Sequence, residues 1–581
     1  MNNRHLKIAL LVLLFFISLS LFAGVNRQYI VPVDESDNLM DIMKSLYIES
    51  GLALPSSTAP YSVAELQLMT EQVKVEKLNS ISLKQYSYLL EKLQSYTKEI
   101  DNDVLMDTNS KISLESYAHL NTDYFTERSD WVYDWQEQQK LFNMDVDLMA
   151  NDIAYSFVNI QLGVSEHSYY EDGGIDFGTG HLSFNIPGVD NISLMDINTD
   201  LSDRAFLAFG GDNWSVQAGR DQISWGNGIS GNLFLSDNLE YQNMARYTFF
   251  GKKIKYSYIA SFFPFQGNYV SDLEVDSVTS QYDELVGFSM FTAHKIEGRL
   301  FNRLGWSLSE GNMFVSKDGT VDMSAFNPML SYHSLYYKAN CNSIISADLD
   351  LTIGSHFNLY AQAVIDDLVF PIGESKTGSW SPDAWGVLGG FRITTEKEGY
   401  QNLTTFEFAY TTPYLYMRNT GDTNSEQEGY GINFIVALRK FDQNGIYFDE
   451  QYLGYEYGGD AIVFNINNKI YDRNKWSFET NLFLMLHGTF DTDTTWAPVG
   501  EATNRTEDST PTTYNYSDDG KNAVEYTGIL GFYSSFNIAD KFEVYNQLDF
   551  VGIINPDNVY DSDSSNFEAD VQLTVGMSIS Y

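Results

Sequence analysis

The last fifteen residues of the chain alternate between apolar and polar side chains without interruption. They read FEADVQLTVGMSISY, and their apolar members are Phe567, Ala569, Val571, Leu573, Val575, Met577, Ile579 and Tyr581. A period of two places successive side chains on opposite faces of a β-strand. The segment therefore predicts a strand with one apolar face and one polar face, which ends on an aromatic residue.

A strand of this kind is typical of bacterial outer-membrane β-barrels, whose strands contact lipid on one face and the lumen on the other. Tyr581 would present this strand to the barrel-assembly machinery. The alternative is an edge strand of a soluble sheet. The opposite end of the chain favours export, because Arg4 and Lys7 precede an apolar run from 8 to 23. This arrangement predicts a signal peptide over residues 1–23, and no later apolar run reaches the roughly 20 residues that a membrane helix needs.

Charge and cysteine content exclude several classes of partner. The net charge is 35 − 78 = −43, which excludes nucleic acid because its binders neutralise phosphates with Lys and Arg. The histidines are scattered, so the sequence predicts no metal site and no cofactor. Cys341 is the only cysteine, so no intramolecular disulfide can form. Aromatic residues make up 15% of the chain, which suits the aromatic girdles of a membrane barrel or a carbohydrate-binding surface.

Residues 24–108 predict a small three-helix domain on the periplasmic side. One apolar face is formed by Leu39, Ile42, Met43, Leu46 and Tyr47, which recur at helical spacing. Two capping boxes, Ser62 with Glu65 and Ser82 with Gln85, predict the starts of two further helices.

Residues 109–581 predict a large antiparallel transmembrane β-barrel, so the fold class is mainly β. About 470 residues at roughly 26 per strand give about 18 strands, within a range of 14–20 and even in number. Polar stretches of unequal length separate the strands, and the longest runs from about 491 to 521. Acidic residues opposite the apolar ones, such as Glu407 between Phe406 and Phe408, are expected to face a wet lumen.

Two neighbouring segments resemble a known family. Residues 218–228 read AGRDQISWGNG and lead into LFLSDN at 233–238. They resemble the signature region of the Wzi family of capsule assembly proteins, which has a Gly-Arg strand end, a Trp-Gly-x-Gly turn and an apolar-Ser-x-Asn segment. Asn227 stands where that family usually has proline. The segments STAPY at 57–61 and EFAYTTPYLY at 407–416 also resemble the family.

The resemblance implies an outer-membrane barrel of about 18 strands with periplasmic helices beside or partly inside it. It also implies a lectin-like role in anchoring capsular polysaccharide at the cell surface, without catalysis. The expected partners are outer-membrane lipid and surface or capsular polysaccharide. The glycan, the openness of the lumen and the oligomeric state are left open by the sequence.

Four residues are candidates for a polysaccharide or lumen site: Arg220, Asp221, Trp225 and Asn227. The face of Trp225 could stack on a sugar ring while Arg220 and Asp221 bind hydroxyls or carboxylates. The alternative is a tight turn whose Trp225 packs in the lumen, with Arg220 paired to an interior acid.

Two other classes of function are compatible with a chain of this kind. A porin for small solutes would use the same barrel with an open lumen. A glycosidase needs two carboxylates about 5–10 Å apart, and Asp348 with Asp350 share one strand face, but a solvated lumen explains both residues. No nucleophile or metalloprotease motif supports catalysis, so the chain is expected not to be an enzyme.

Overall fold

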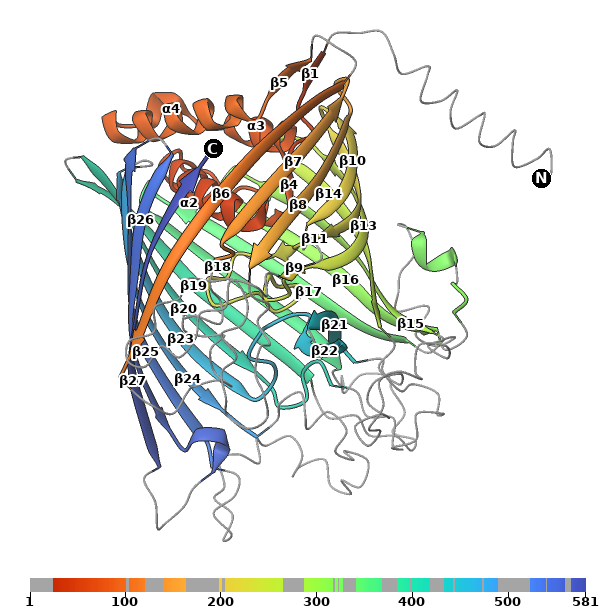
Figure 1. The fold of residues 1–581 in the computed structure, drawn as a ribbon, viewed down its shortest axis with the longest axis vertical. Helices are drawn as coiled ribbons and strands as arrows, with labels where there is room; N and C mark the ends of the chain where they lie inside the picture. The colour runs from red at the N-terminus through yellow and green to blue at the C-terminus, as the bar shows by residue number, and fades with distance from the viewer. Residues whose placement is uncertain are drawn as a thin grey trace.

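The computed structural model shows a large β-barrel with a helical domain at one end (Figure 1). We call this end the helix-side end and the opposite end the loop-side end. The structure describes residues 24–100, 104–120, 139–163, 198–200, 204–264, 287–316, 319–321, 323–327, 341–367, 384–397, 399–417, 433–442, 445–472, 475–489, 523–539, 541–559 and 566–581. The predicted signal peptide and the long polar stretch at 491–521 lie outside these ranges.

Eighteen antiparallel strands close the barrel. Strand β27 pairs with β6, and pairing between β8 and β10 completes the ring. This confirms the predicted fold class and strand number. The barrel strands are β6 (Val104–His119), β7 (Phe142–Ala150), β8 (Ala154–Gly163), β10 (Ala205–Gly211), β11 (Trp214–Asp221), β13 (Gln242–Phe250), β14 (Ile254–Pro264), β15 (Phe288–Leu300), β16 (Leu304–Ser316), β17 (Cys341–Ile353), β18 (Phe357–Asp367), β19 (Ala384–Lys397), β20 (Tyr400–Thr411), β23 (Ala461–Asp472), β24 (Trp476–His487), β25 (Glu525–Ala539), β26 (Phe542–Ile554) and β27 (Phe567–Ser580). A short strand, β9 (Asn198–Asp200), adds to β8.

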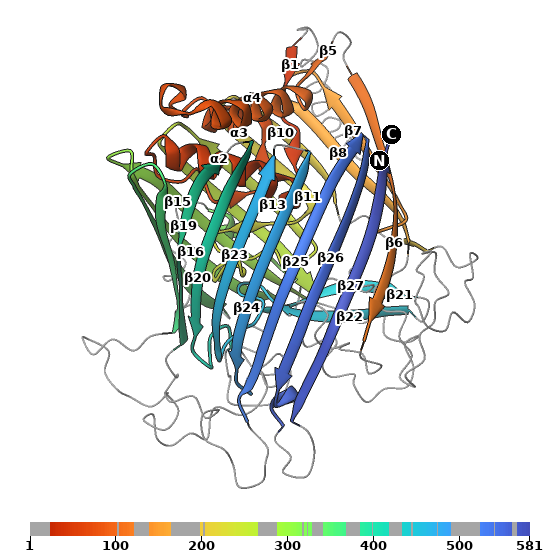
Figure 2. The same cartoon turned by 90° about the vertical axis from the view of Figure 1, so that its left-hand side faces the viewer.

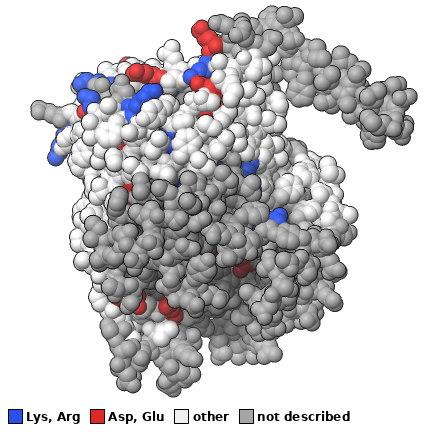
Figure 3. Space-filling view, viewed as in Figure 1, with Lys and Arg blue, Asp and Glu red and all other residues white. Residues whose placement is uncertain are grey.

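The alternation in the last strand appears directly in the burial of its side chains. Leu573, Val575, Met577 and Ile579 are exposed on the outer surface, whereas Asp570, Gln572, Thr574 and Ser578 are buried on the inner one. On the face shown in Figure 3, Lys, Arg, Asp and Glu side chains gather around the helical domain. An apolar outer wall is what a lipid-facing barrel requires.

The two ends of the barrel differ in their connections. Turns of two or three residues join the strands at the helix-side end, for example at 151–153, 212–213, 251–253, 301–303 and 354–356. The C-terminus also lies at this end (Figures 1 and 2). The strand connections at the other end span many more residues, for example from 265 to 287 and from 488 to 524. Short turns on one side and long loops on the other match the pattern of outer-membrane barrels.

The helical domain contains α2 (Val33–Glu49), α3 (Val63–Thr70) and α4 (Ser80–Ser95). Its core buries the predicted apolar face of α2, which consists of Leu39, Ile42, Met43, Leu46 and Tyr47. The Ser62 side chain caps α3 by accepting from the Glu65 amide at 3.3 Å, as the capping box predicts. In the part of the chain that the structure describes, no helix combines the length and apolar character needed to cross a membrane.

The start of α4 differs from the prediction. The cap is Asn79, whose side chain accepts from the amides of Ile81 and Ser82 at 2.7 and 3.1 Å. Asn79 is the N-cap because its side-chain oxygen accepts from two amides of the first turn, which have no partner within the helix. Ser82 instead donates to Glu396 of β19 and so contacts the barrel.

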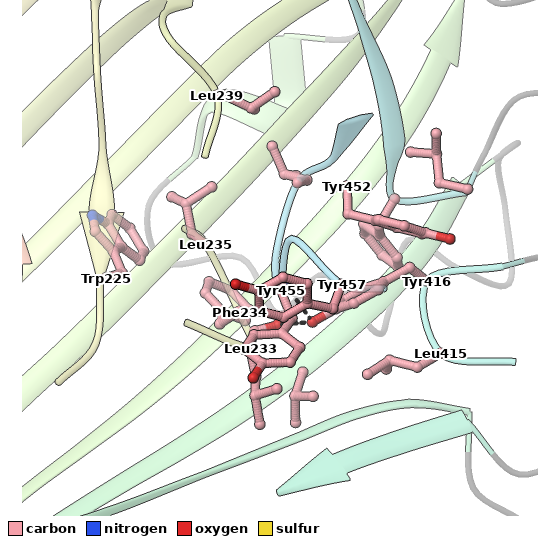
Figure 4. Packing of buried hydrophobic residues seen from close by; sticks show 14 of the residues in the cluster. Trp225, Leu233, Phe234, Leu235, Leu239, Leu415, Tyr416, Tyr452, Tyr455 and Tyr457 are labelled. Atoms are coloured by element: carbon pink, nitrogen blue, oxygen red, sulfur yellow. Dashed lines mark hydrogen bonds between the residues drawn. The ribbon is translucent and has the colours of Figure 1, made fainter. Parts of the chain in front are cut away.

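Protein fills the lumen at mid-height. Residues 223–241 and the hairpin of β21 (Ile435–Asp442) and β22 (Gly445–Tyr452) form what we call the lumen plug. The plug packs against lumen-facing side chains such as Phe291, Leu388 and Phe483. Figure 4 shows part of this cluster from close by, with Leu233, Phe234 and Leu235 of the plug. The buried plug side chains include Ile223, Trp225, Leu233, Phe234, Leu235, Leu239, Tyr241, Ile435, Val436, Leu438 and Tyr452.

A segment of the helical domain also enters the barrel. Residues 53–62, which we call the docking segment, contain β3 (Thr58–Ala59), and this strand pairs with β12 (Ser224–Trp225) of the plug. Next to this pair, the Gly226 amide donates to the Ser57 carbonyl at 2.9 Å. The segment is also tied to the rest of the domain by the pairing of β2 (Ile30–Val31) with β4 (Tyr61–Ser62). A further pair, β1 (Gly24–Asn26) with β5 (Lys98–Ile100), flanks the domain.

The expectation that acidic residues face a wet lumen needs correction where these segments lie. Glu407 is 5% exposed and Asp350 is 8% exposed. Alternation along a strand assigns a side chain to the inner face, but it does not show what occupies the space beyond it. Here protein groups occupy that space.

Candidate functional site

Arg220 and Asp221 lie on opposite faces of the barrel wall, because they are consecutive residues at the loop-side end of β11. Asp221 is fully buried on the inner face. Arg220 shares the outer face with the exposed Trp214 and Val216. The structure therefore does not bring the two predicted ligand-binding residues to one site.

Asp221 belongs to a polar network inside the barrel. Its carboxylate lies 2.6 Å from Nε of Arg204 and accepts from the Gln217 side chain at 2.6 Å. Gln217 in turn accepts from Nε of Arg246 at 2.6 Å. The charge pair and the hydrogen bonds hold these side chains in place. This network ties Arg204, which directly precedes β10, to β11 and β13 across the inner wall.

Arg220 lies at the edge of a cavity of about 450 Å³, which we call the rim pocket. Its guanidinium is 3.8 Å from the ring centre of Tyr241, and its Nε donates to the Asn243 side chain at 3.4 Å. The Tyr241 hydroxyl donates to the Arg439 carbonyl of the hairpin at 2.8 Å. The pocket is lined by Arg220, Tyr241, Asn243, Phe262, Phe263, Pro264, Ala437, Leu438 and Arg439.

Trp225 packs inside the lumen plug. It is 3% exposed, its ring stacks on Phe234 at 6.0 Å, and its backbone pairs with Thr58 on one side and Leu235 on the other. Figure 4 shows the indole beside Leu235. In this conformation the indole face is covered by protein, so its contribution is to join the docking segment to the plug.

Asn227 lies in the turn after Trp225. Its carbonyl accepts from the buried guanidinium of Arg392. The turn needs glycine on either side: a Cβ on Gly226 would lie 1.8 Å from the Asn232 side-chain oxygen, and one on Gly228 would lie 1.9 Å from the Gly231 carbonyl. The Trp-Gly-x-Gly motif is therefore required by the close return of the chain upon itself.

Glu407 is the plug contact that the sequence did not single out. Its carboxylate accepts from the amides of Ile229 and Ser230 at 3.0 and 2.8 Å, and from the hydroxyls of Ser230 and Tyr360 at 2.6 Å each. The only sequence signal is its inward position on β20, which many lumen acids share. Burial also raises the pKa of Tyr455 well above its usual value, so this residue stays neutral beside Ser230.

Ion pairs hold the docking segment and its helix at the helix-side end, and we call this set the latch. Nζ of Lys255 lies 2.5 Å from Glu65 of α3 and donates to the Thr58 carbonyl at 2.8 Å. On the next strand, Nζ of Lys295 lies 2.8 Å from Asp348. Burial raises the pKa of Glu65 even though Lys255 opposes that shift. Beside these contacts is a cavity of about 60 Å³.

The two aspartates weighed as a glycosidase pair are both engaged in these contacts. Asp348 pairs with Lys295 and accepts from the Ser307 hydroxyl. Asp350 accepts from the Leu54 amide of the docking segment at 2.7 Å. Among the described residues, no group of three or more His, Cys, Asp or Glu side chains is placed to hold a metal ion.

Comparison with known proteins identifies the family. The sequence profile of capsule assembly protein Wzi matches residues 105–507. A search of curated proteins gave no match to the sequence. Among solved structures, the fold is similar to Wzi of Escherichia coli with a TM-score of 0.54 and 12% identity, covering 96% of this chain and 99% of that one. That protein is described as an outer membrane protein involved in group 1 capsule assembly and as a carbohydrate-binding β-barrel.

Two channel structures also match over much of the chain. The outer membrane channel DcaP of Acinetobacter baumannii gives a TM-score of 0.34 at 9% identity, covering 83% of this chain and 99% of that one. A BenF-like porin from Pseudomonas fluorescens gives 0.36 at 8% identity, covering 82% and 99%. Since the Wzi profile covers more than half of the sequence, this chain is a β-barrel of the bacterial outer membrane and belongs to the capsule assembly protein Wzi family.

Proposed function

We propose that this protein holds surface or capsular polysaccharide at the cell surface and acts as a binding protein without catalysis. Family membership supports the assignment, as does the printed description of the E. coli relative as carbohydrate-binding. The observation that carries it is the filled lumen. Apolar plug side chains from residues 223–241 and the hairpin occupy the space that a porin keeps open.

The direct test is deletion of the gene in the native host. We expect polysaccharide to be released into the medium while its total amount stays unchanged, because retention and synthesis are separate steps. Re-expression of the full chain restores retention. Polysaccharide that stays bound to the deletion strain would contradict the proposal.

A separate measurement tests whether the protein cleaves the polysaccharide. Purified protein incubated with the host polysaccharide leaves the chain-length distribution unchanged, while the protein co-sediments with the polymer. Shortening of the polymer that scales with protein concentration would show an enzyme instead.

In this proposal, Asp221, Trp225 and Asn227 act by positioning. They fix the inner wall and the turn of the plug, and so set the shape of the loop-side surface that meets the polymer. Trp225→Ala should weaken co-sedimentation with polysaccharide about as much as a lesion elsewhere in the plug does. Loss of binding with an unchanged plug, measured by hydrogen exchange, would instead assign Trp225 to direct contact.

The proposal also includes the orientation of the barrel in the outer membrane. We place the helical domain in the periplasm, because both short turns and the C-terminal strand lie at the helix-side end, and β27 then reaches the barrel-assembly machinery from that side. Lys84 is exposed on α4 and the native Cys341 is buried. A Lys84→Cys variant should react with an impermeant thiol reagent only after the outer membrane is permeabilised. Reaction in intact cells would reverse the orientation.

A further inference from the structure

The rim pocket combines two arginines with an apolar wall. Arg220 comes from β11 and Arg439 from the hairpin, while Phe262 and Pro264 come from the loop-side end of β14. The chain carries 78 acidic residues against 35 basic ones, so an anion is repelled from much of the surface. A pocket that is lined by two arginines is therefore a site where an anionic group could be bound selectively.

The Arg220 guanidinium is held in a defined orientation. It lies 3.8 Å from the ring centre of Tyr241, while its Nε contacts the Asn243 side chain at 3.4 Å. Tyr241 is itself fixed by its hydrogen bond to the Arg439 carbonyl. Stacking of this kind orients the planar donor fork that matches phosphate and carboxylate oxygens.

The Arg220 side of the pocket lies on the outer face of the barrel wall, whereas Tyr241 and residues 437–439 of the hairpin form its other side. Arg220 follows Val216 and Ala218 on the outward positions of β11, and both of these residues are exposed. Its partner in the register is Asn243 of β13, which is also exposed. Val216 and Ala218 form an apolar strip that leads along the wall to the arginine.

The wall beneath the pocket is short. Strands β10, β11 and β13 have 7, 8 and 9 residues, whereas β25, β26 and β27 have 15, 13 and 14. A strand needs about 9–11 residues to cross the bilayer core. Figure 1 shows that β25–β27 reach further toward the loop-side end than β11 and β13. The loop-side end of the short wall therefore lies within the bilayer rather than beyond it, and the long side chain of Arg220 can extend from there to the headgroups.

We propose that the rim pocket binds the phosphate-bearing headgroup of an outer-leaflet glycolipid. Arg220 and Arg439 contact the phosphate, and the acyl chains lie along Val216, Ala218 and Phe262. The polysaccharide proposal does not require this site, and this site does not require the polysaccharide. A glycolipid is favoured over a polymer because the arginine lies at the end of an apolar, outward-facing strip.

The test uses the full chain reconstituted in nanodiscs that contain phosphatidylethanolamine and lipid A, with retained lipid A measured by mass spectrometry after detergent extraction. The variants are Arg439→Gln alone and Arg220→Gln with Arg439→Gln. The matched control is Arg27→Gln, since Arg27 is 44% exposed in an ion pair with Asp212 at the helix-side end. Heat-modifiable gel migration verifies that each barrel is folded.

We expect the double variant to retain about tenfold less lipid A, the single variant an intermediate amount, and the control the wild-type amount. Lipid A without phosphates should bind the wild type as weakly as intact lipid A binds the double variant. Excess inorganic phosphate should not displace the lipid, because it cannot replace the acyl-chain contacts.

Three results would overturn the proposal. Equal retention by the wild type and the folded variants would show that the arginines do not bind the headgroup. Displacement by inorganic phosphate would identify a site for a free anion. Loss of polysaccharide co-sedimentation with lipid A retention intact would assign the pocket to the polymer.

Discussion

Two regions that pack inside the barrel differ in their chemistry. At mid-height, the lumen plug packs aromatic and aliphatic side chains such as Phe234 and Leu235 against the inner wall. At the helix-side end, the latch uses buried charges, with Lys255 paired to Glu65 and Lys295 paired to Asp348. The docking segment connects the two regions through the pairing of Thr58 with Trp225.

Because the plug is held by apolar packing and the latch by buried ion pairs, different substitutions should destabilise each of them. Apolar packing is non-directional and its loss scales with the volume removed. A buried ion pair contributes little net stability, but removal of one partner leaves an uncompensated charge. Substitution of a large side chain by a small one should therefore destabilise the plug. Removal of one charge from an ion pair should destabilise the latch.

The largest effect is expected from Phe234→Ala. Phe234 is 2% exposed, and its ring stacks on Trp225 and contacts Phe291 at an angle. The change therefore leaves a cavity that costs about 4 kcal/mol. Hydrogen exchange of residues 223–241 measures the loosened plug. Phe301→Ala is the control, because Phe301 is 91% exposed in a helix-side turn. Equal exchange in both variants would contradict the packing role of Phe234.

Lys255→Met should have the next largest effect. It leaves Glu65 without its partner at 2.5 Å and should weaken the attachment of the docking segment by about 3 kcal/mol. Adding Glu65→Leu should restore much of the loss, because no buried charge is then left unpaired. Hydrogen exchange of residues 53–62 reports the attachment. A double variant no better than the single one would rule out the charge argument.

The third effect depends on pH. Burial, together with the neighbouring Glu396 carboxylate, raises the pKa of Glu49 to about 8. The folded protein favours the protonated acid, so the stability that it contributes is full below the ordinary value of 4.5 and is lost as pH rises through about 8. Attachment of the helical domain should weaken from pH 5 to pH 9. Glu49→Gln should flatten this profile, and an unchanged profile would exclude Glu49 as its source.

The smallest effect is expected from Lys252→Met. Lys252 lies 3.4 Å from Glu71, and both side chains are more than 60% exposed. Exposed pairs contribute less than about 1 kcal/mol, so exchange in the docking segment should stay near the wild-type rate. This variant removes the same side-chain type as Lys255→Met, and a similar loss in both would show that burial does not set the cost.

Much of the fold follows from local patterns in the sequence. The uninterrupted alternation at residues 567–581 predicts the outward and inward faces of β27, and helical spacing predicts the buried face of α2. The barrel strand β6 begins at Val104 rather than at the predicted domain boundary of 109. The expected capping box at Ser82 failed because Asn79, three residues earlier, satisfies two helix amides.

The interior was harder to foresee. The hairpin strand β21 begins with four consecutive apolar residues at 435–438, as a buried strand of a sheet can. Only the closed ring of eighteen strands shows that this hairpin lies outside the wall. Trp225 stands in a motif that suits sugar stacking, yet the pairing of Thr58 with Trp225 comes from segments more than 160 residues apart. Sequence spacing does not encode such long-range contacts. Whether the four predicted residues contact polysaccharide stays a prediction.

Planar-bilayer recording tests the closed lumen most directly. Purified wild-type protein should insert without large, long-lived openings, because the plug and the latch both occupy the lumen. Phe234→Ala combined with Lys255→Met should produce such openings, since both closures are then weakened. A large, steady open-channel current from the wild-type protein would contradict the account and restore the porin as the better explanation.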